Sequence, residues 1–216
     1  MFLRKFYTVP FIWNFLQSLI GSNSFKMSLF PSIFTKRGKI LDFACSMGNC
    51  TSFFADFDYW GIDIDERAIN AATKVFKNFS NIHFVCADTL SETFEEFDFD
   101  FVLMSCVGHH LNDGQFEQTL VSLMARLKKG GSLHFLDPVS RPEKDNFITR
   151  FFIKHDQGKF VRTIEENKKM FGSYPTAELQ IVDCPNRLIK LEDLLYIKIF
   201  KEWRINVSRH RCPTDC

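Results

Sequence analysis

A run of small residues follows a short apolar segment near position 40, and its spacing suits a loop that lies against a ligand. Ala44, Ser46 and Gly48 come at intervals of two residues after Asp42. Residues with little or no side chain let a nucleotide-like ligand approach the backbone. In a dinucleotide-binding fingerprint the third glycine comes five residues after the first, whereas here Asn49 takes that position and the glycine comes one residue earlier. This spacing favours a ligand without a pyrophosphate group.

Two more acids, Asp63 and Asp88, end later apolar segments. Asp63 comes 21 residues after Asp42, where a carboxylate can accept hydrogen bonds from both hydroxyls of a ribose, and this acid suits NAD equally well. Asp88 is suited to accept a hydrogen bond from the exocyclic amine of an adenine. One such acid is more often a turn residue or a helix cap, but three at consecutive segment ends predict a nucleoside site.

The segments before these residues are typical of buried parallel strands, because they are short and mostly apolar. They cover residues 39–43, 59–63, 83–87, 99–105 and 132–136. Amphipathic helices are expected between them, one with Ala68, Ile69, Ala72, Val75, Phe76 and Phe79 on one face and one with Phe116, Leu120, Leu123, Met124 and Leu127. Asp65 and either Asn112 or Asp113 are expected to cap these helices, and Lys128–Gly131 is expected to stop the second.

Strands that alternate with helices predict an α/β fold, a doubly wound, Rossmann-like and mostly parallel sheet with helices on both faces. Residues 181–182 and 194–200 are expected to add an antiparallel closing hairpin, which makes seven strands. The ligand site of such a sheet lies beyond the carboxyl ends of its strands. The small residues and acids named above are therefore expected to meet at one edge.

A single domain is expected over residues 1–210, followed by a tail at 211–216. Residues 1–37 are expected to form an N-terminal helical cap, since the apolar run from Val9 to Ile20 is too short for a membrane span. Residues 140–175 are expected to form an insertion over the substrate site. No stable membrane insertion is predicted.

The net charge of +1 gives no support for binding to nucleic acid. Seven cysteines are an odd number, and none has the spacing of zinc ligands, so free thiols in a reducing cytoplasm and no bound metal are expected.

As an ordered set, these motifs resemble the class I S-adenosylmethionine (AdoMet) dependent methyltransferases, in the small-molecule branch of type 11 and 12 domains. The resemblance covers residues 38–138 and departs from the family at Ala44 and Ser46, where glycine is usual. The motifs that carry it are Ile40–Gly48, Gly61–Asp65, Cys86–Thr89, Phe99–Asp113 and Leu127–Gly131.

The resemblance implies that AdoMet is the cofactor and that a methyl group moves to an O, N or C nucleophile of a small metabolite, such as a glycan or secondary-metabolite precursor. It implies that Asp42 and Ser46 hold the amino-acid end of AdoMet, while Asp63 takes the ribose. The other cofactor residues that it implies are Ala44 and Gly48 beside the ligand, Ile64, Asp88 and Thr89 around the adenine, and Ser105 and Cys106 on the methionine side.

Candidates for catalysis and for substrate binding lie further along the chain. His109 or His110 could remove a proton from the acceptor, although such a pair also occurs where one ring only packs or bonds to the backbone. His155, Asp156 and Arg162 lie in the expected insertion. Arg162 could clamp a carboxylate or phosphate, or could pair with Asp156.

Two other functions compete with methyl transfer. An NAD-dependent oxidoreductase would share Asp63, but Asn49, Asp88 and the absence of a downstream Tyr-x-x-x-Lys pair disfavour it. A protein with the AdoMet fold that does not methylate, or a pseudoenzyme, is kept open by Ala44 and Ser46.

Overall fold

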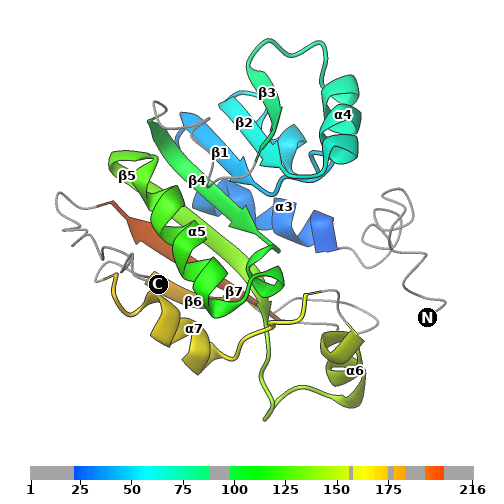
Figure 1. Cartoon of the computed structure of the whole chain (residues 1–216), viewed down its shortest axis with the longest axis vertical. Coiled ribbons are helices and arrows are strands. Elements are labelled where there is room, and N and C mark those ends of the chain that lie inside the picture. Colours follow the sequence, from blue (N-terminus) through cyan, green and yellow to red (C-terminus); the bar gives the residue numbers. More distant parts are fainter. Residues whose placement is uncertain (1–21, 88–97, 156–157, 175–177, 183–192, 202–216) are drawn as a thin grey trace, which may run out of the picture.

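A seven-stranded sheet forms the centre of the molecule. The computed structural model describes residues 22–87, 98–155, 158–174, 178–182 and 193–201. The strand order is β3-β2-β1-β4-β5-β7-β6, in which β1 to β5 are parallel and β7 is antiparallel to β5 and β6 (Figure 1). The predicted mostly parallel sheet with an antiparallel closing pair is confirmed. The strands are β1 Lys39–Phe43, β2 Asp58–Asp63, β3 Ile82–Cys86, β4 Phe99–Ser105, β5 Leu127–Val139, β6 Glu178–Val182 and β7 Asp193–Phe200.

The fifth strand is longer than the apolar pattern predicts. It begins at Leu127, which pairs with Phe99 before the register shifts, rather than at residue 132. In this added segment the Lys128 ammonium forms an ion pair with Asp100 Oδ1 at 3.0 Å. The preceding helix ends at Ala125, before the expected stop at Lys128–Gly131, so Leu127 begins β5 and does not lie on the helix face as predicted.

Helices connect the strands, and the predicted caps begin two of them. Asp65 accepts hydrogen bonds from the backbone N–H groups of Arg67 and Ala68. Asn112 forms a capping box with Gln115. The N-termini of both helices are therefore capped as predicted. The helices are α3 Ser22–Ile33, α4 Glu66–Val75, α5 Asp113–Ala125, α6 Phe147–His155 and α7 Ile164–Phe171, with short 3-10 turns η1 Thr51–Phe54 and η3 Gly108–His110.

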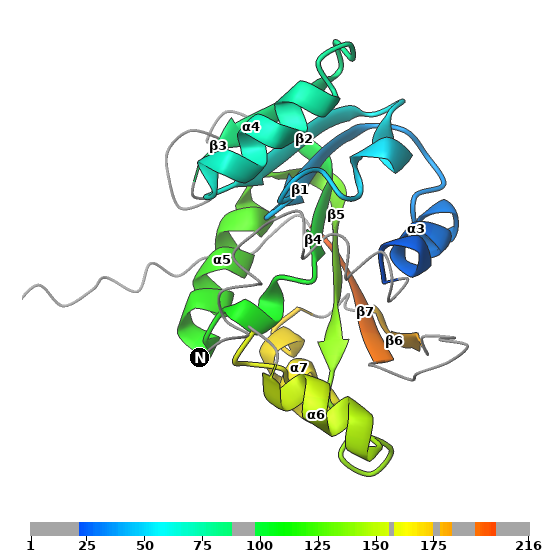
Figure 2. The same cartoon turned by 90° about the vertical axis from the view of Figure 1, so that its right-hand side faces the viewer.

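The two faces of the sheet carry separate apolar cores. On one face, α3 and η1 pack through Phe30, Phe34 and Phe54. On the other face, α5 and α7 pack against β5, and the rings of Phe116 and Phe171 have centroids 5.6 Å apart. Figure 2 shows α3 on the opposite side of the sheet from α5. The expectation of helices on both faces is therefore confirmed.

The expected insertion over residues 140–175 contains two helices with different positions. α6 lies beyond the carboxyl end of β5 (Figure 2). α7 instead belongs to the core, because Phe171 is buried against Phe116 and Phe135. In the expected N-terminal cap, α3 packs on the sheet, and residues 1–21 lie outside the described part. Among the described helices, none has the length and apolar character needed to cross a membrane.

Candidate functional site

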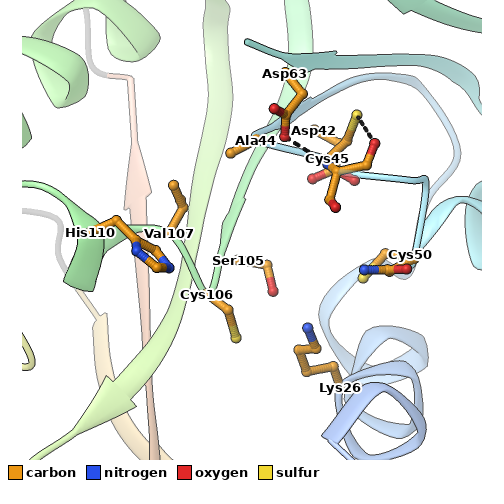
Figure 3. Close-up of a pocket in the computed structure, with 12 residues that line it drawn as sticks. Lys26, Asp42, Ala44, Cys45, Cys50, Asp63, Ser105, Cys106, Val107 and His110 are labelled. Atoms are coloured by element: carbon orange, nitrogen blue, oxygen red, sulfur yellow. Dashed lines mark hydrogen bonds between the residues drawn. The ribbon is translucent and has the colours of Figure 1, made fainter. Parts of the chain in front are cut away.

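A cavity of about 230 Å³ opens at the carboxyl ends of β1, β2 and β4 (Figure 3). This is the edge where the sequence predicted a ligand site. The residues that line it are Lys26, Asp42, Ala44, Cys45, Ser46, Asn49, Cys50, Asp63, Ser105, Cys106, Val107 and His110. The structure thus brings together Asp42, Ala44, Ser46, Asp63, Ser105 and Cys106 from the implied cofactor set, and His110 from the catalytic pair.

The loop after β1 has an unusual backbone. Ala44, Ser46 and Gly48 have φ angles of 57°, 51° and 77°. This left-handed conformation costs a residue that carries a Cβ, such as Ala44 or Ser46, roughly 1–2 kcal/mol, whereas Gly48 adopts it freely. Hydrogen bonds from Cys45 N to Ile62 O at 3.0 Å and from Gly48 N to Cys45 O at 3.0 Å hold the loop closed.

Gly48 is required by packing around the loop. A Cβ at this position would lie 2.9 Å from Thr51 Oγ1 and 3.2 Å from the ring of Phe76. Gly48 is also not among the described residues that line the cavity. The glycine therefore permits the loop to pack, whereas the sequence assigned it to the approach of the ligand.

Asp63 is fixed by the backbone on both sides of its carboxylate. Oδ2 accepts a hydrogen bond from Ser46 N at 2.9 Å, and Oδ1 accepts one from Asp65 N at 2.8 Å. Each oxygen keeps a lone pair for a further donor, and the carboxylate faces the cavity (Figure 3). The geometry suits a pair of neighbouring hydroxyls. Ile64, which follows, is 77% exposed at the end of β2.

Asp42 is buried at the base of the cavity. The Tyr59 hydroxyl donates to its Oδ2 at 2.7 Å. Burial raises the pKa of Asp42 from 3.8 to about 7, although the Tyr59 hydrogen bond and the charge of Lys26 act to lower it. The carboxyl therefore changes its charge near neutral pH.

Asp42→Asn is expected to flatten the pH dependence of stability. Because the folded pKa exceeds the unfolded one, the folded state binds the extra proton above pH 4, and this stabilisation is lost as the pH rises through 7. Wild type should lose about 2 kcal/mol relative to the variant between pH 5 and 7.5. Urea denaturation of both proteins across this range measures the difference. His134, whose pKa is lowered to about 3 by burial, contributes in the opposite direction. Its contribution is the same in both proteins, so it cancels when one stability curve is subtracted from the other.

Parallel stability curves for the two proteins would contradict this account of Asp42.

Lys26 is a cavity residue that the sequence analysis did not identify. It lies on α3 with 4% of its surface exposed. Its position on the helix gives a signal that could have found it, because Lys26, Phe30 and Phe34 are spaced by four residues and share one face. A lysine within an apolar stripe is expected to point into the molecule.

The two histidines after β4 have separate surroundings. His110 lines the cavity. His109 is 5% exposed, and its Nδ1 lies 2.9 Å from Asp137 Oδ1, at the end of β5. Gly158 covers its ring so closely that a Cβ there would lie 1.8 Å from His109 Cδ2. Of the two candidates for a base, only His110 faces the cavity, and the buried partner Asp137 was not predicted.

Arg162 is engaged with the loop between β4 and α5. Its guanidinium donates to Asp113 Oδ1 at 2.8 Å, to Leu111 O at 2.8 Å and to Gly108 O at 3.1 Å. Arg162 is not among the described cavity residues, and the pairing with Asp156 considered above lies outside the described part of the chain. Asp88, Thr89 and Asp156 lie outside the described residues, as does the side chain of His155, the last residue of α6.

Metal ligands do not gather in the described part of the chain, where no group of three or more His, Cys, Asp or Glu side chains could hold an ion. Of the described cysteines, Cys45, Cys50, Cys86 and Cys106 form no disulfide bond.

Known proteins resemble this chain in sequence and in fold. Residues 40–131 match the family model described as a methyltransferase domain. The PH0226 protein from Pyrococcus horikoshii OT3 shares the fold with a TM-score of 0.66 at 20% identity, covering 86% of this chain and 92% of that chain. N-methyltransferase NodS from Bradyrhizobium japonicum WM9 has a TM-score of 0.61 at 19% identity, covering 88% and 97%.

A third similar structure is that of the plantazolicin methyltransferase BpumL in complex with a monoazolic desmethylPZN analog and SAH. It has a TM-score of 0.65 at 16% identity and covers 92% of this chain and 90% of that chain. No curated protein matches the sequence. The residues in the family match include the loop after β1, Asp63, and the β4 end with Ser105 and His110.

Proposed function

We propose that this chain, whose residues 40–131 match the methyltransferase-domain model, is a class I AdoMet-dependent methyltransferase that transfers a methyl group from AdoMet to an oxygen, nitrogen or carbon of a small metabolite. The observation that carries the proposal is the cavity at the carboxyl ends of the strands, where the left-handed loop after β1 faces the anchored carboxylate of Asp63. AdoMet supplies an activated methyl group on its sulfonium.

The residues present fit such a cofactor. Asp63 retains acceptors for the ribose hydroxyls, and the small side chains of Ala44 and Ser46 leave the loop open to the ligand. Ser105 Oγ is buried without a hydrogen-bond partner in the described structure, as expected for a group that a ligand satisfies. Asp42, Ser46 and Cys106 would border the methionine end.

Methyl transfer mainly requires the protein to align the acceptor with the methyl group and to exclude water. His110 is the described imidazole in the cavity, so it is the group proposed to accept a proton from the acceptor. The His109–Asp137 pair lies beside it, with the two imidazole centroids 4.3 Å apart. Ile64, with Asp88 and Thr89 beyond the described residues, is proposed to frame the adenine.

The acceptor is proposed to be a small molecule, such as a glycan or secondary-metabolite precursor. The names of the N-methyltransferase NodS and the plantazolicin methyltransferase BpumL are consistent with this class. We also propose that residues 1–210 form one domain and that the protein is cytoplasmic.

Calorimetric titration with AdoMet, S-adenosylhomocysteine (AdoHcy) and NAD tests the proposal. We expect saturable binding of both sulfur nucleosides and no binding of NAD. Binding of NAD alone would favour the oxidoreductase, and failure of both sulfur nucleosides to bind would rule out methyl transfer. If AdoMet binds but no AdoHcy forms when the protein is incubated with AdoMet and mixed metabolite extracts, the non-methylating alternative would be favoured.

A further inference from the structure

Cys106 directly follows β4, with its thiol open to the cavity. Its φ angle of 54° is left-handed, and its backbone N–H donates a hydrogen bond to Leu136 O at 2.7 Å. Strained positions of this kind persist where the surrounding structure holds them, and they cluster at functional sites. The side chain is partly exposed and lines the cavity, so small molecules that enter the cavity can reach the sulfur.

Lys26 places a positive charge beside this sulfur. It is 4% exposed, and its ammonium donates a hydrogen bond to the Cys106 thiol, while no carboxylate of the described residues lies within 4.0 Å to form an ion pair with it. Burial lowers the pKa of Lys26, but Cys106, Cys50 and Asp42 together raise it above its usual value, so the ammonium persists at neutral pH. An adjacent ammonium favours the thiolate, which is the nucleophilic form of cysteine.

A third group faces the same part of the cavity. The hydroxyl of Ser105 is buried without a hydrogen-bond partner in the described structure. Figure 3 shows this hydroxyl, the Cys106 sulfur and the Lys26 ammonium directed into one part of the cavity. A hydroxyl and an ammonium can each donate a hydrogen bond to an oxygen atom held at the sulfur. The three groups together therefore suit a small oxygen-containing reagent such as a peroxide.

The other described cysteines lack this combination of access and charge. Cys45 and Cys50 are buried, and burial raises the pKa of Cys50 to about 12 and raises that of Cys45 as well. Both therefore remain protonated at neutral pH. Cys86 is exposed at the end of β3 and is not among the described residues that line the cavity. Cys86 thus provides an internal reference for a reagent that reacts with accessible thiols.

We propose that Cys106 is a site of oxidative modification, at which hydrogen peroxide converts the thiolate to a sulfenic acid and so weakens binding of the cofactor. The sulfur attacks one peroxide oxygen, and an S–O bond forms as the O–O bond breaks. The hydroxide that leaves takes up a proton to become water, so sulfur is oxidised by two electrons and the peroxide is reduced. The effect on the cofactor rests on the proposed function, in which Cys106 borders the methionine end. The reactivity of the thiol does not.

Alkylation by iodoacetamide at pH 7, followed by peptide mass spectrometry, measures the reactivity of each cysteine separately. In wild type, Cys106 should react about 10-fold faster than Cys86, although Cys86 is the more exposed. In Lys26→Met, the rate at Cys106 should fall about 10-fold because the ammonium is lost. Lys36→Met, which removes an exposed lysine after α3, should retain the wild-type rate. A wild-type Cys106 that reacts no faster than Cys86 would overturn the inference.

Treatment of wild type with hydrogen peroxide tests the effect on the cofactor and does not depend on how Lys26→Met folds. Dimedone should trap a sulfenic acid at Cys106, and calorimetry should show AdoHcy affinity reduced at least about 10-fold, with recovery after dithiothreitol. In Cys106→Ser, peroxide should not change the affinity of that variant for AdoHcy. Oxidation of Cys106 that leaves the affinity unchanged would overturn the inference. Failure of untreated wild type to bind AdoHcy would instead overturn the proposed function, and the alkylation rates would still test Cys106, so the two failures are distinguishable.

Discussion

Asp63→Ala is expected to weaken AdoHcy binding about 100-fold while the sheet remains folded. The substitution removes one or two hydrogen bonds between the carboxylate and the ribose hydroxyls, and each bond to a charged group is worth roughly 1.5–3 kcal/mol. The variant also removes the acceptor for Ser46 N, which helps to hold the loop after β1. Calorimetry gives the affinity, and circular dichroism establishes that the fold is retained.

Asp58→Ala is the matched control for this variant. Asp58 lies at the opposite end of β2, where its carboxylate is half exposed and accepts a hydrogen bond from Trp60 Nε1. Its loss should leave AdoHcy affinity within about twofold of wild type, because surface changes have small effects. Unchanged affinity in Asp63→Ala would mean that the ribose site has been misplaced.

Arg162→Met is expected to lower the free energy of unfolding by about 2–3 kcal/mol through lost hydrogen bonds. The side chain is 7% exposed, and its removal takes the guanidinium donor from Leu111 O and one of two donors from Gly108 O, which keeps the hydrogen bond from Leu111 N. The guanidinium also lies 4.9 Å from the centroid of the Phe116 ring. The ion pair with Asp113 contributes little, because that carboxylate is 79% exposed. Urea denaturation measures the change.

This experiment also separates the two roles considered for Arg162. Arg67→Met serves as the control, since it removes an exposed arginine from α4 and should change stability by less than about 0.5 kcal/mol. If Arg162→Met were as stable as wild type but bound its acceptor less well, Arg162 would be a substrate clamp, as the sequence suggested. A large loss of stability instead assigns it to holding the β4–α5 loop, which carries His110.

Local sequence patterns were sufficient to predict the order of the parallel strands and the edge of the sheet that carries the site, although not the start of β5. The alternation of apolar segments with amphipathic helices predicts β1 to β5, and Asp65 and Asn112 cap helices as their residue types predict. The small residues Ala44 and Ser46 mark the loop after β1 that borders the cavity. These features depend on neighbours in the sequence, so the sequence alone carries them.

Features that depend on distant parts of the chain could not be predicted in this way. Arg162 donates to Asp113, 49 residues away, which no local pattern in the sequence indicates. His109 pairs with Asp137 only because β4 and β5 are neighbours in the sheet. Lys26 reaches the cavity because α3 packs across the strands, and helix periodicity alone does not say which strand ends it will meet.

A crystal structure of the complex with AdoHcy tests the central claim most directly. We expect both ribose hydroxyls within hydrogen-bond distance of the Asp63 carboxylate and the sulfur near Ser105 and Cys106. Electron density for AdoHcy at another place on the molecule, or a ribose without contact to Asp63, would contradict the account.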